Sequence, residues 1–397
     1  MRQAVITHAV RTPIGRFLGA FKTLSAVDLG TAAVSGLLDR AGLSPDEVDR
    51  VIMGQARQAG CGPNPARQVA IRAGMPETTP AWTTNMACGS GLLTVIEAAR
   101  LVRSGEASCV LAGGMESMTR VPFLLPEARL GYRMGHDLMV DGMYRDGFDC
   151  PLAGQVMGET AETLAREGGI TRREQDAFAA ASQNKVEAAL ASGRFEAEIV
   201  PVEVQDRKGR VETVTRDEHP RAGVTVESLA KLPPVFDREM GTVTAGNASG
   251  ITDGAAAVLV MDEETARGRG FRPLALVEAW EMAGVDPARM GLGPVPAVRK
   301  LCERLRRALS SFDLVELNEA FAAQVLACDR ELGLDHEKLN VNGGAIALGH
   351  PIGCTGTRIV TTLLHEMARR GAETGLATLC ISGGQGLAVA FKAPPAA

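Results

Sequence analysis

The chain has 397 residues and a formal net charge of −5 at neutral pH, with 45% hydrophobic and 22% charged residues. This composition excludes disorder over most of the chain, because it supplies enough apolar surface for a large core. The acidic balance and the low aromatic content of 4% argue against a nucleic-acid-binding protein, which needs basic surface and stacking rings. At about 150 residues per domain, the length predicts two or three domains.

Eight cysteines are spread along the chain, and no two of them form the C-x-x-C pair found in many metal and redox sites. We therefore expect free thiols and no metal centre. The first residues run directly into a strand-like segment without an apolar leader, and no stretch approaches the roughly 18 apolar residues that span a bilayer. These features predict a cytoplasmic protein without a membrane span.

The first third of the sequence alternates helical and strand-like patterns. Helices are predicted over 29–41 and 92–102, each followed by a glycine, and strands over 51–54 and 108–112. This alternation is typical of an α/β architecture with largely parallel strand pairing.

The sequence changes character between about residues 118 and 247, where arginine, proline and methionine become more frequent. A helix is predicted over 172–192 between loops. A strand pattern returns at 255–261, and a second α/β set starts at 273–280. We interpret the middle segment as an insertion that covers a site.

The two ends of the chain follow a similar plan. Each has a buried strand, a reactive residue flanked by glycine, a helix, and a second strand that runs into Gly-Gly. The reactive residue is Cys88 in the first half and His350 in the second. The match is short, so an internal duplication is a hypothesis at this point.

Cys88 lies in the segment Asn-Met-Ala-Cys-Gly-Ser-Gly, directly before a predicted helix. Unpaired N–H groups and partial positive charge at a helix start favour a thiolate, so we expect a lowered pKa for this thiol. The alternative is a buried, inert cysteine, which is the commoner fate of a free thiol. The glycine-rich context favours a nucleophile.

For each of three further residues, the sequence allows two possible roles. His350, between glycine and proline at a predicted helix start, could accept a proton from a distant thiol or could be a capping or surface histidine. Cys380 ends a strand before a glycine-rich turn and could be an acid–base group or a packed core residue. Asn318 follows a strand and could orient a water or an oxyanion, or could cap a helix.

Segments over essentially the whole chain, in family order, resemble the thiolase family. These segments are RTPIGRF at 11–17, NPARQ at 64–68, NMACGSG at 85–91, GGMESM at 113–118, MGETAE at 157–162, GTVTAGNASG at 241–250, NEAFA at 318–322, GHPIG at 349–353 and CISGG at 380–384.

The resemblance implies a thiolase fold, with two similar α/β halves in α-β-α-β-α layers, each half with a mixed five-stranded sheet. Residues 1–117 with 248–270 would form the N-terminal half, and 271–397 the C-terminal half. Residues 118–247 would form a loop domain over the coenzyme A site. The resemblance also implies a homodimer or homotetramer.

The resemblance implies a role for each site residue. Cys88 would be the acyl-accepting nucleophile, and His350 would take its proton. Cys380 would act as acid and base at C2 of acetyl-CoA. Asn318 would hold a water that forms one oxyanion site with His350, and the backbone N–H groups of Cys88 and Ser382 would form the other.

The implied reaction is reversible thiolytic cleavage of 3-ketoacyl-CoA, or condensation with acetyl-CoA, in fatty acid metabolism. Coenzyme A and acyl-CoA are the implied substrates, with no resident cofactor, metal or nucleic acid. The residues expected at the coenzyme A and acyl group are Arg221, Ala245, Ser249, Met157 and Ala320.

Two alternatives stay open at this point: a ketosynthase-type condensing enzyme of the same fold, which usually carries two histidines with its cysteine, and a non-catalytic acyl-CoA-binding assembly subunit. The chain also departs from the family pattern at three places. Ser382 replaces a usual glycine, and Cys354 is an extra thiol near His350. Val156 replaces a histidine that is common in short-chain biosynthetic members, which weakens the expectation of an acetoacetyl-CoA preference.

Overall fold

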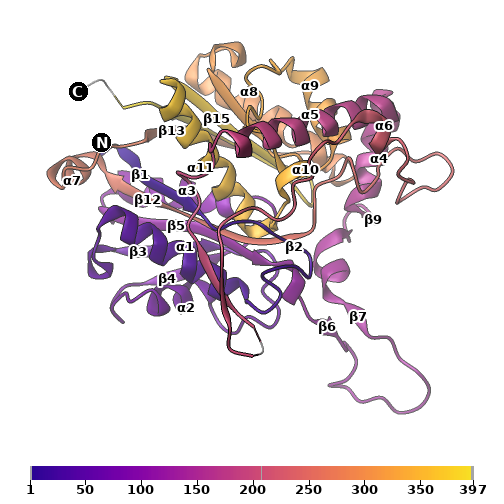
Figure 1. Ribbon diagram of the computed structural model, residues 1–397, viewed down its shortest axis with the longest axis horizontal. Coiled ribbons are helices and arrows are strands. Elements are labelled where there is room, and N and C mark those ends of the chain that lie inside the picture. The colour runs from indigo at the N-terminus through magenta and orange to yellow at the C-terminus, as the bar shows by residue number, and fades with distance from the viewer. Residues whose placement is uncertain (1, 207, 395–397) are drawn as a thin grey trace.

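A long mixed β-sheet runs through the computed structural model, which describes residues 2–206 and 208–394 (Figure 1). Its strands, in spatial order, are β14 (Leu314–Leu317), β15 (Thr374–Ile381), β16 (Gln385–Lys392), β13 (Ala275–Gly284), β1 (Ala4–Arg11), β12 (Thr252–Asp262), β5 (Cys109–Ser117), β3 (Arg50–Gly54) and β4 (Ala81–Thr84). The short strand β2 (Gly15–Arg16) pairs with β12 beside this path.

The order and direction of the strands repeat in the two halves of the sheet. In the first half, β1, β12 and β5 pair antiparallel, and β5, β3 and β4 pair parallel. In the second half, β13, β16 and β15 pair antiparallel, and β15 and β14 pair parallel. The repeat confirms the prediction of two similar α/β halves.

The expected fifth strand of the second half is absent from the described residues, so that detail of the prediction is wrong. A single parallel bridge from Val315 to Leu339 stands in its place. The next residue, Asn340, uses its side-chain amide to accept from the Leu317 N–H and donate to the Leu317 carbonyl, both at 2.9 Å. The amide therefore satisfies the backbone groups that a fifth strand would have paired. The two halves also join across β1 and β13, so their sheets are continuous.

Helices form three layers around and between the two halves of the sheet (Figure 1). The central layer is α3 (Ser90–Ser104) and α11 (Ile352–Arg370), whose apolar residues share one core with strands of both halves. The outer layers are α1 (Ala26–Ala41) and α2 (Pro65–Arg72) on the first half, and α8 (Pro294–Leu305) and α9 (Ala322–Leu332) on the second. This arrangement is the expected α-β-α-β-α order.

Glycines allow the N-terminal ends of α3 and α11 to touch. A Cβ at Gly91 would lie 2.8 Å from the carbonyl oxygen of Gly353, and a Cβ at Gly356 would overlap the backbone of α3. Only glycine permits such close approach of two backbones. Because Cys88 precedes α3 and His350 precedes α11, this contact brings both residues to the place where the two helices begin.

The segment between β5 and β12 carries small elements of its own, among them a β6/β7 hairpin that projects from the body (Figure 1). These elements are β6 (Phe123–Leu124), β7 (Val140–Asp141), β8 (Asp149–Cys150), β9 (Gln155–Val156), α4 (Met157–Gly168), α5 (Arg172–Ala191), β10 (Val202–Gln205), β11 (Val211–Val214) and α6 (Val226–Leu229). The remaining helices are α7 (Glu263–Gly268) and α10 (Ala345–Leu348), with single turns at Pro45–Glu47, Met118–Arg120, Tyr144–Phe148, Pro287–Leu292 and Leu309–Ser311. The exact limits of a loop domain stay a prediction.

The helices and strands predicted in the sequence are present, with shifted ends. Helix α1 begins three residues before the predicted start, because Ser25 and Asp28 form a capping box there. Strand β5 continues to Ser117 beyond the predicted end, and its Gly114 leaves room for α11, because a Cβ there would overlap the backbone at Gly353. Within 2–206 and 208–394, no helix has the length and apolar character that crossing a membrane requires.

Candidate active site

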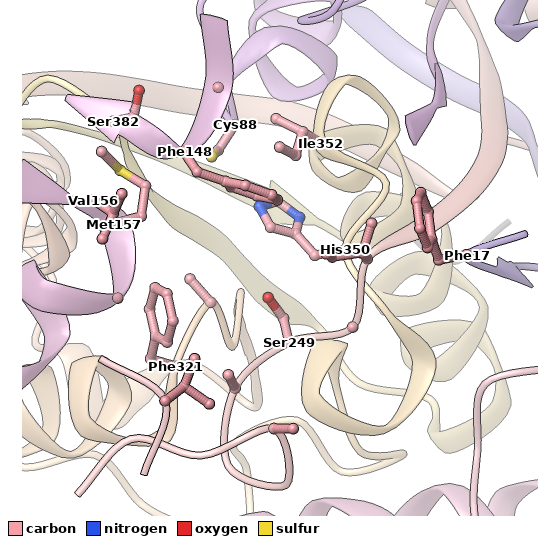
Figure 2. A pocket seen from close by; sticks show the side chains of 18 of the residues that line it. Phe17, Cys88, Phe148, Val156, Met157, Ser249, Phe321, His350, Ile352 and Ser382 are labelled. Carbon is pink, nitrogen blue, oxygen red and sulfur yellow. The ribbon is translucent and has the colours of Figure 1, made fainter. Parts of the chain in front are cut away.

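A cavity of about 650 Å³ lies where the two halves and the inserted segment meet. Figure 2 shows the Cys88 thiol, the His350 ring and the Phe148 ring in its wall, with Val156, Met157 and Phe321 around the same opening. The sequence-predicted site residues that line the cavity are Cys88, His350, Cys380, Ser382, Met157, Arg221, Ala245, Ser249 and Ala320. The structure therefore brings together residues that are far apart in the sequence.

Cys88 lies in a tight turn between β4 and α3. The Gly89 N–H donates to the Met86 carbonyl, and the Ser90 N–H donates to the Ala87 carbonyl. Ala87 has a φ of 46°, in the left-handed region that non-glycine residues rarely adopt. Backbone strain of this kind persists only where the surrounding structure holds it, and it is common beside reactive groups.

The expected lowering of the Cys88 pKa is wrong. Burial raises the pKa of the thiol above its ordinary value, while the charge of Arg57 and the backbone N–H groups of Ser382 and Cys88 oppose this rise without overcoming it. The helix start alone would lower the pKa, but the loss of water around the buried sulfur has the larger, opposite effect. The same two N–H groups are those expected to form an oxyanion site, and they face the thiol.

His350 is held in one tautomer by its neighbour. The Thr355 hydroxyl donates to the Pro351 carbonyl at 3.0 Å, so it accepts from Nδ1–H of His350 at 2.6 Å. Nε2 is then the basic nitrogen, and it is buried without a hydrogen-bond partner among the described residues. Burial, with the charges of Arg358 and Arg57, lowers the pKa of His350 to about 3. The ring is therefore neutral and free to accept a proton.

Cys380 lies at the end of β15 and is 1% exposed. Burial raises the pKa of this thiol well above its ordinary value, and the nearby Cys88 raises it further. A thiol that keeps its proton in this way can donate it to a carbanion formed beside it. Cys380 is packed in a core, as one interpretation predicted, and it also lines the cavity, so the acid–base interpretation stays a prediction.

Asn318 is buried behind the cavity and does not line it. Both side-chain polar atoms lack a partner among the described residues, as Nε2 of His350 does. Buried polar atoms of this kind usually bind a water. The helix-cap alternative is wrong, because α9 begins at Ala322 with Phe321 at its N-cap.

The far end of the cavity is more polar. Arg221 and His219 line it together with Ala245, and the same three residues border an adjoining space of about 320 Å³. The Ser249 N–H donates to the Ala320 carbonyl at 3.0 Å, which fixes the wall between the two ends. The two spaces share this polar border, so together they extend from Cys88 to Arg221 and beyond it.

The sequence analysis missed Glu116, although it lies in the quoted GGMESM segment. This carboxylate is fully buried and accepts from the N–H groups of Ala56, Arg57 and Gly353. It thereby ties the end of β3 to the first turn of α11. Burial raises its pKa, and the charge of Arg57 is the largest opposing cause. A glutamate in an otherwise apolar strand was the available signal.

Of the three departures from the family pattern, two line the cavity: Val156 and Ser382. The extra thiol, Cys354, does not line it and is 1% exposed. Burial raises the pKa of Cys354 to about 12, so this residue is a packed core thiol. All eight cysteines are free.

Two family models and several known proteins match the chain. Residues 4–264 match the model of the thiolase N-terminal domain, and residues 271–393 match that of the thiolase C-terminal domain. The chain is 53% identical to an acetyl-CoA acetyltransferase of Pseudomonas aeruginosa, over 98% of this chain and 99% of that protein. It is 51% identical to one of Escherichia coli, over 99% of each.

Solved structures are similar over nearly the whole chain. The acetyl-CoA acetyltransferase of Bacillus anthracis superposes with a TM-score of 0.97 at 44% identity, and covers 99% of each chain. Human mitochondrial 3-ketoacyl-CoA thiolase superposes with a TM-score of 0.95 at 42% identity, again over 99% of each chain.

Proposed function

The chain belongs to the thiolase family, and we propose that it catalyses reversible, coenzyme A-dependent cleavage of 3-ketoacyl-CoA through an acyl group on Cys88. The reverse reaction is Claisen condensation with acetyl-CoA. The observation that carries the proposal is one cavity lined by the Cys88 thiol, a neutral imidazole with a free Nε2, and the protonated Cys380 thiol.

The first half-reaction starts at the C3 carbonyl of the substrate. Nε2 of His350 takes the proton of Cys88, and the thiolate attacks C3. The C2–C3 bond then breaks, and its electron pair leaves on C2 as the enolate of acetyl-CoA. Cys380 protonates C2, which releases acetyl-CoA and leaves the shortened acyl group on Cys88.

The second half-reaction returns the enzyme to its starting state. The thiol of a free coenzyme A loses its proton to the Cys380 thiolate and attacks the acyl carbon. The bond to the Cys88 sulfur breaks, and the proton held by His350 returns to that sulfur. Two half-reactions through a covalent intermediate predict ping-pong kinetics.

Two groups of donors would stabilise the oxyanions. The backbone N–H groups of Cys88 and Ser382 both act on the thiol, which is where a tetrahedral carbon would form. A water between Asn318 and the protonated His350 would stabilise the enolate oxygen. The unpartnered amide of Asn318 supports this second site.

The finer features of the proposal concern binding and assembly. Met157, Ala245, Ser249 and Ala320 would contact the pantetheine and acyl region, and Arg221 the nucleotide end of coenzyme A. Residues 118–247 would act as the loop domain over this site. No resident cofactor or metal is needed for the steps above.

We also propose that the chain works in the cytoplasm, in fatty acid metabolism, as a homodimer or homotetramer. Support for self-association comes from the projecting β6/β7 hairpin, where Leu130 and Met134 are 82% and 94% exposed. A second copy of the chain would cover these side chains.

The direct test is a thiolysis assay that follows loss of the 3-ketoacyl-CoA enolate absorbance, with substrates of increasing acyl length. Activity with free coenzyme A is expected, together with acetylation of Cys88 by acetyl-CoA in mass spectrometry. Turnover only with a decarboxylating malonyl donor would favour the ketosynthase alternative, although Asn318 stands where a second histidine would be expected. Binding of acyl-CoA without turnover would favour the assembly subunit.

A further inference from the structure

An arginine lies at the nucleophile end of the cavity and has no role in the steps above. Arg57 follows β3, is 7% exposed, and lines the cavity together with Cys88. Its backbone N–H is fixed by Glu116, which also holds the first turn of α11 through Gly353. The arginine is therefore anchored to the same scaffold that places His350.

The Arg57 guanidinium forms no salt bridge with a described acidic group. No carboxylate within 2–206 and 208–394 lies within 4 Å of the guanidinium, and its Nε atom is buried without a partner. The guanidinium lies against Gly147, where a Cβ would overlap it. The charge of Arg57 acts on the buried Glu116 without a salt bridge, and this carboxylate accepts three backbone N–H groups instead.

A buried cation that forms no salt bridge is costly, and this one lines the cavity together with Cys88, so its retention points to an anion that forms at the site. The wall of the same cavity contains many apolar side chains, including Phe148, Val156 and Ile352 (Figure 2). The groups that face the Cys88 sulfur are Arg57, Glu116, His350 and Cys380. Of these, only Arg57 carries a fixed positive charge.

We propose that Arg57 is a positioning residue for the nucleophile, whose charge stabilises the Cys88 thiolate from which acyl transfer starts. This inference rests on the proposed role of Cys88. The charge of Arg57 is the largest cause that lowers the pKa of Cys88 against the effect of burial. It also lowers the pKa of His350, so it disfavours the imidazolium as well. Its action therefore shows most clearly in the ionisation of the thiol itself.

The test is the pH dependence of Cys88 alkylation by iodoacetamide, mapped by peptide mass spectrometry in the full-length enzyme. The variants are Arg57→Leu and Arg57→Gln, which remove the charge, and Arg57→Lys, which keeps it. The matched control is Arg72→Leu, since Arg72 is half-exposed on α2 and pairs with Asp28 away from the cavity.

In the neutral variants the alkylation midpoint should rise by roughly one pH unit, which makes alkylation about tenfold slower at pH 7. The acidic limb of the kcat/KM profile should move in the same direction. Arg57→Lys should recover most of the wild-type profile, and Arg72→Leu should keep it. A merely structural role would change the melting temperature without moving these midpoints.

Two results would overturn the inference. One is a wild-type alkylation profile in folded Arg57→Leu or Arg57→Gln. The other is a loss of rate confined to substrates such as 3-oxohexanedioyl-CoA, with 3-oxohexanoyl-CoA and alkylation unchanged, which would assign the cation to an acyl carboxylate. The proposed function has a separate test, which is acylation of Cys88 by acetyl-CoA in the wild-type enzyme. If Cys88 is not acylated there, the proposed function fails, whatever the Arg57 variants show.

Discussion

The two halves of the molecule use one arrangement of strands and helices to supply different chemistry. The turn before α3 presents a thiol, Cys88, whereas the equivalent turn before α11 presents an imidazole, His350. The carboxyl end of β5 carries Glu116, whose carboxylate accepts hydrogen bonds from three backbone N–H groups. The carboxyl end of the equivalent strand β15 carries Cys380, which lines the cavity.

The two halves therefore contribute different kinds of group to one site. In the proposed mechanism, the first half contributes the nucleophile, and its Glu116 carboxylate holds the end of β3 against the first turn of α11. In the same mechanism, the second half would contribute the base, the second thiol and the Asn318 amide. Because the N-terminal ends of α3 and α11 touch through glycines, each half completes the site of the other.

The strongest test of this division is to remove the thiol of the first half. Cys88→Ser should lose acylation by acetyl-CoA and nearly all turnover, because an unactivated hydroxyl is a much weaker nucleophile than a thiolate. Intact-protein mass spectrometry after brief exposure to acetyl-CoA measures the first effect, and steady-state rates the second. An acetyl group on Cys380 in this variant would reverse the roles of the two halves.

Removing the thiol of the second half should separate the two steps. Cys380→Ser should still accept an acetyl group on Cys88, while condensation falls by about 10²–10⁴-fold, as expected for loss of a general acid–base group. The same mass-spectrometric and kinetic measurements apply. Wild-type condensation in this variant would leave Cys380 with a packing role only, and Cys354→Ser serves as the control for removal of a buried thiol outside the cavity.

The scaffold role of the first half is tested at Glu116. In Glu116→Gln an amide NH₂ would face backbone N–H donors, so the variant should lose about 1–3 kcal/mol in the free energy of unfolding. Chemical denaturation measures this loss, with Glu77→Gln as the exposed control. If stability is unchanged while activity falls, the carboxylate acts in the chemistry and the contrast with β15 fails.

The burial of His350 predicts a pH effect on stability. Its pKa is about 3 in the folded protein and about 6.5 when unfolded, so the unfolded state binds more protons between these values. Stability should therefore fall as the pH decreases through this window, by roughly 2 kcal/mol at pH 5. In His350→Asn, which does not titrate there, this contribution should vanish. Parallel pH profiles of unfolding for the two proteins would contradict this, because they would show that the pKa of the ring is the same in the folded and unfolded states.

The sequence predicted the elements of both halves, and it singled out Cys88, His350 and Cys380 because glycine-flanked reactive residues and strand ends leave local signals. It could not predict the electrostatics. The rise of the Cys88 pKa comes from burial by segments that are distant in the sequence. The Arg57 guanidinium can lie where it does because residue 147 of the inserted segment is glycine, and a Cβ there would overlap it. The missing fifth strand depends on one side chain, Asn340, which takes over backbone hydrogen bonds. A side chain that takes over backbone hydrogen bonds in this way leaves no periodic pattern in the sequence.

The smallest expected effect concerns the coenzyme A end, which neither half of the repeat builds alone. Arg221 lies in the inserted segment, is exposed at the mouth of the cavity, and has its backbone N–H fixed by Gln183 at 3.1 Å. Its charge would attract phosphate groups of coenzyme A, and exposed ion pairs of this kind contribute about 1 kcal/mol or less. Arg221→Ala should therefore raise the KM for coenzyme A by about two- to fivefold with kcat nearly unchanged, because it removes binding shared by ground and transition states. Arg173→Ala, an exposed arginine on α5, is the control. A large fall in kcat at constant KM would instead place Arg221 in the chemistry, and the inserted segment would then have to be counted with the two halves as a third source of catalytic groups.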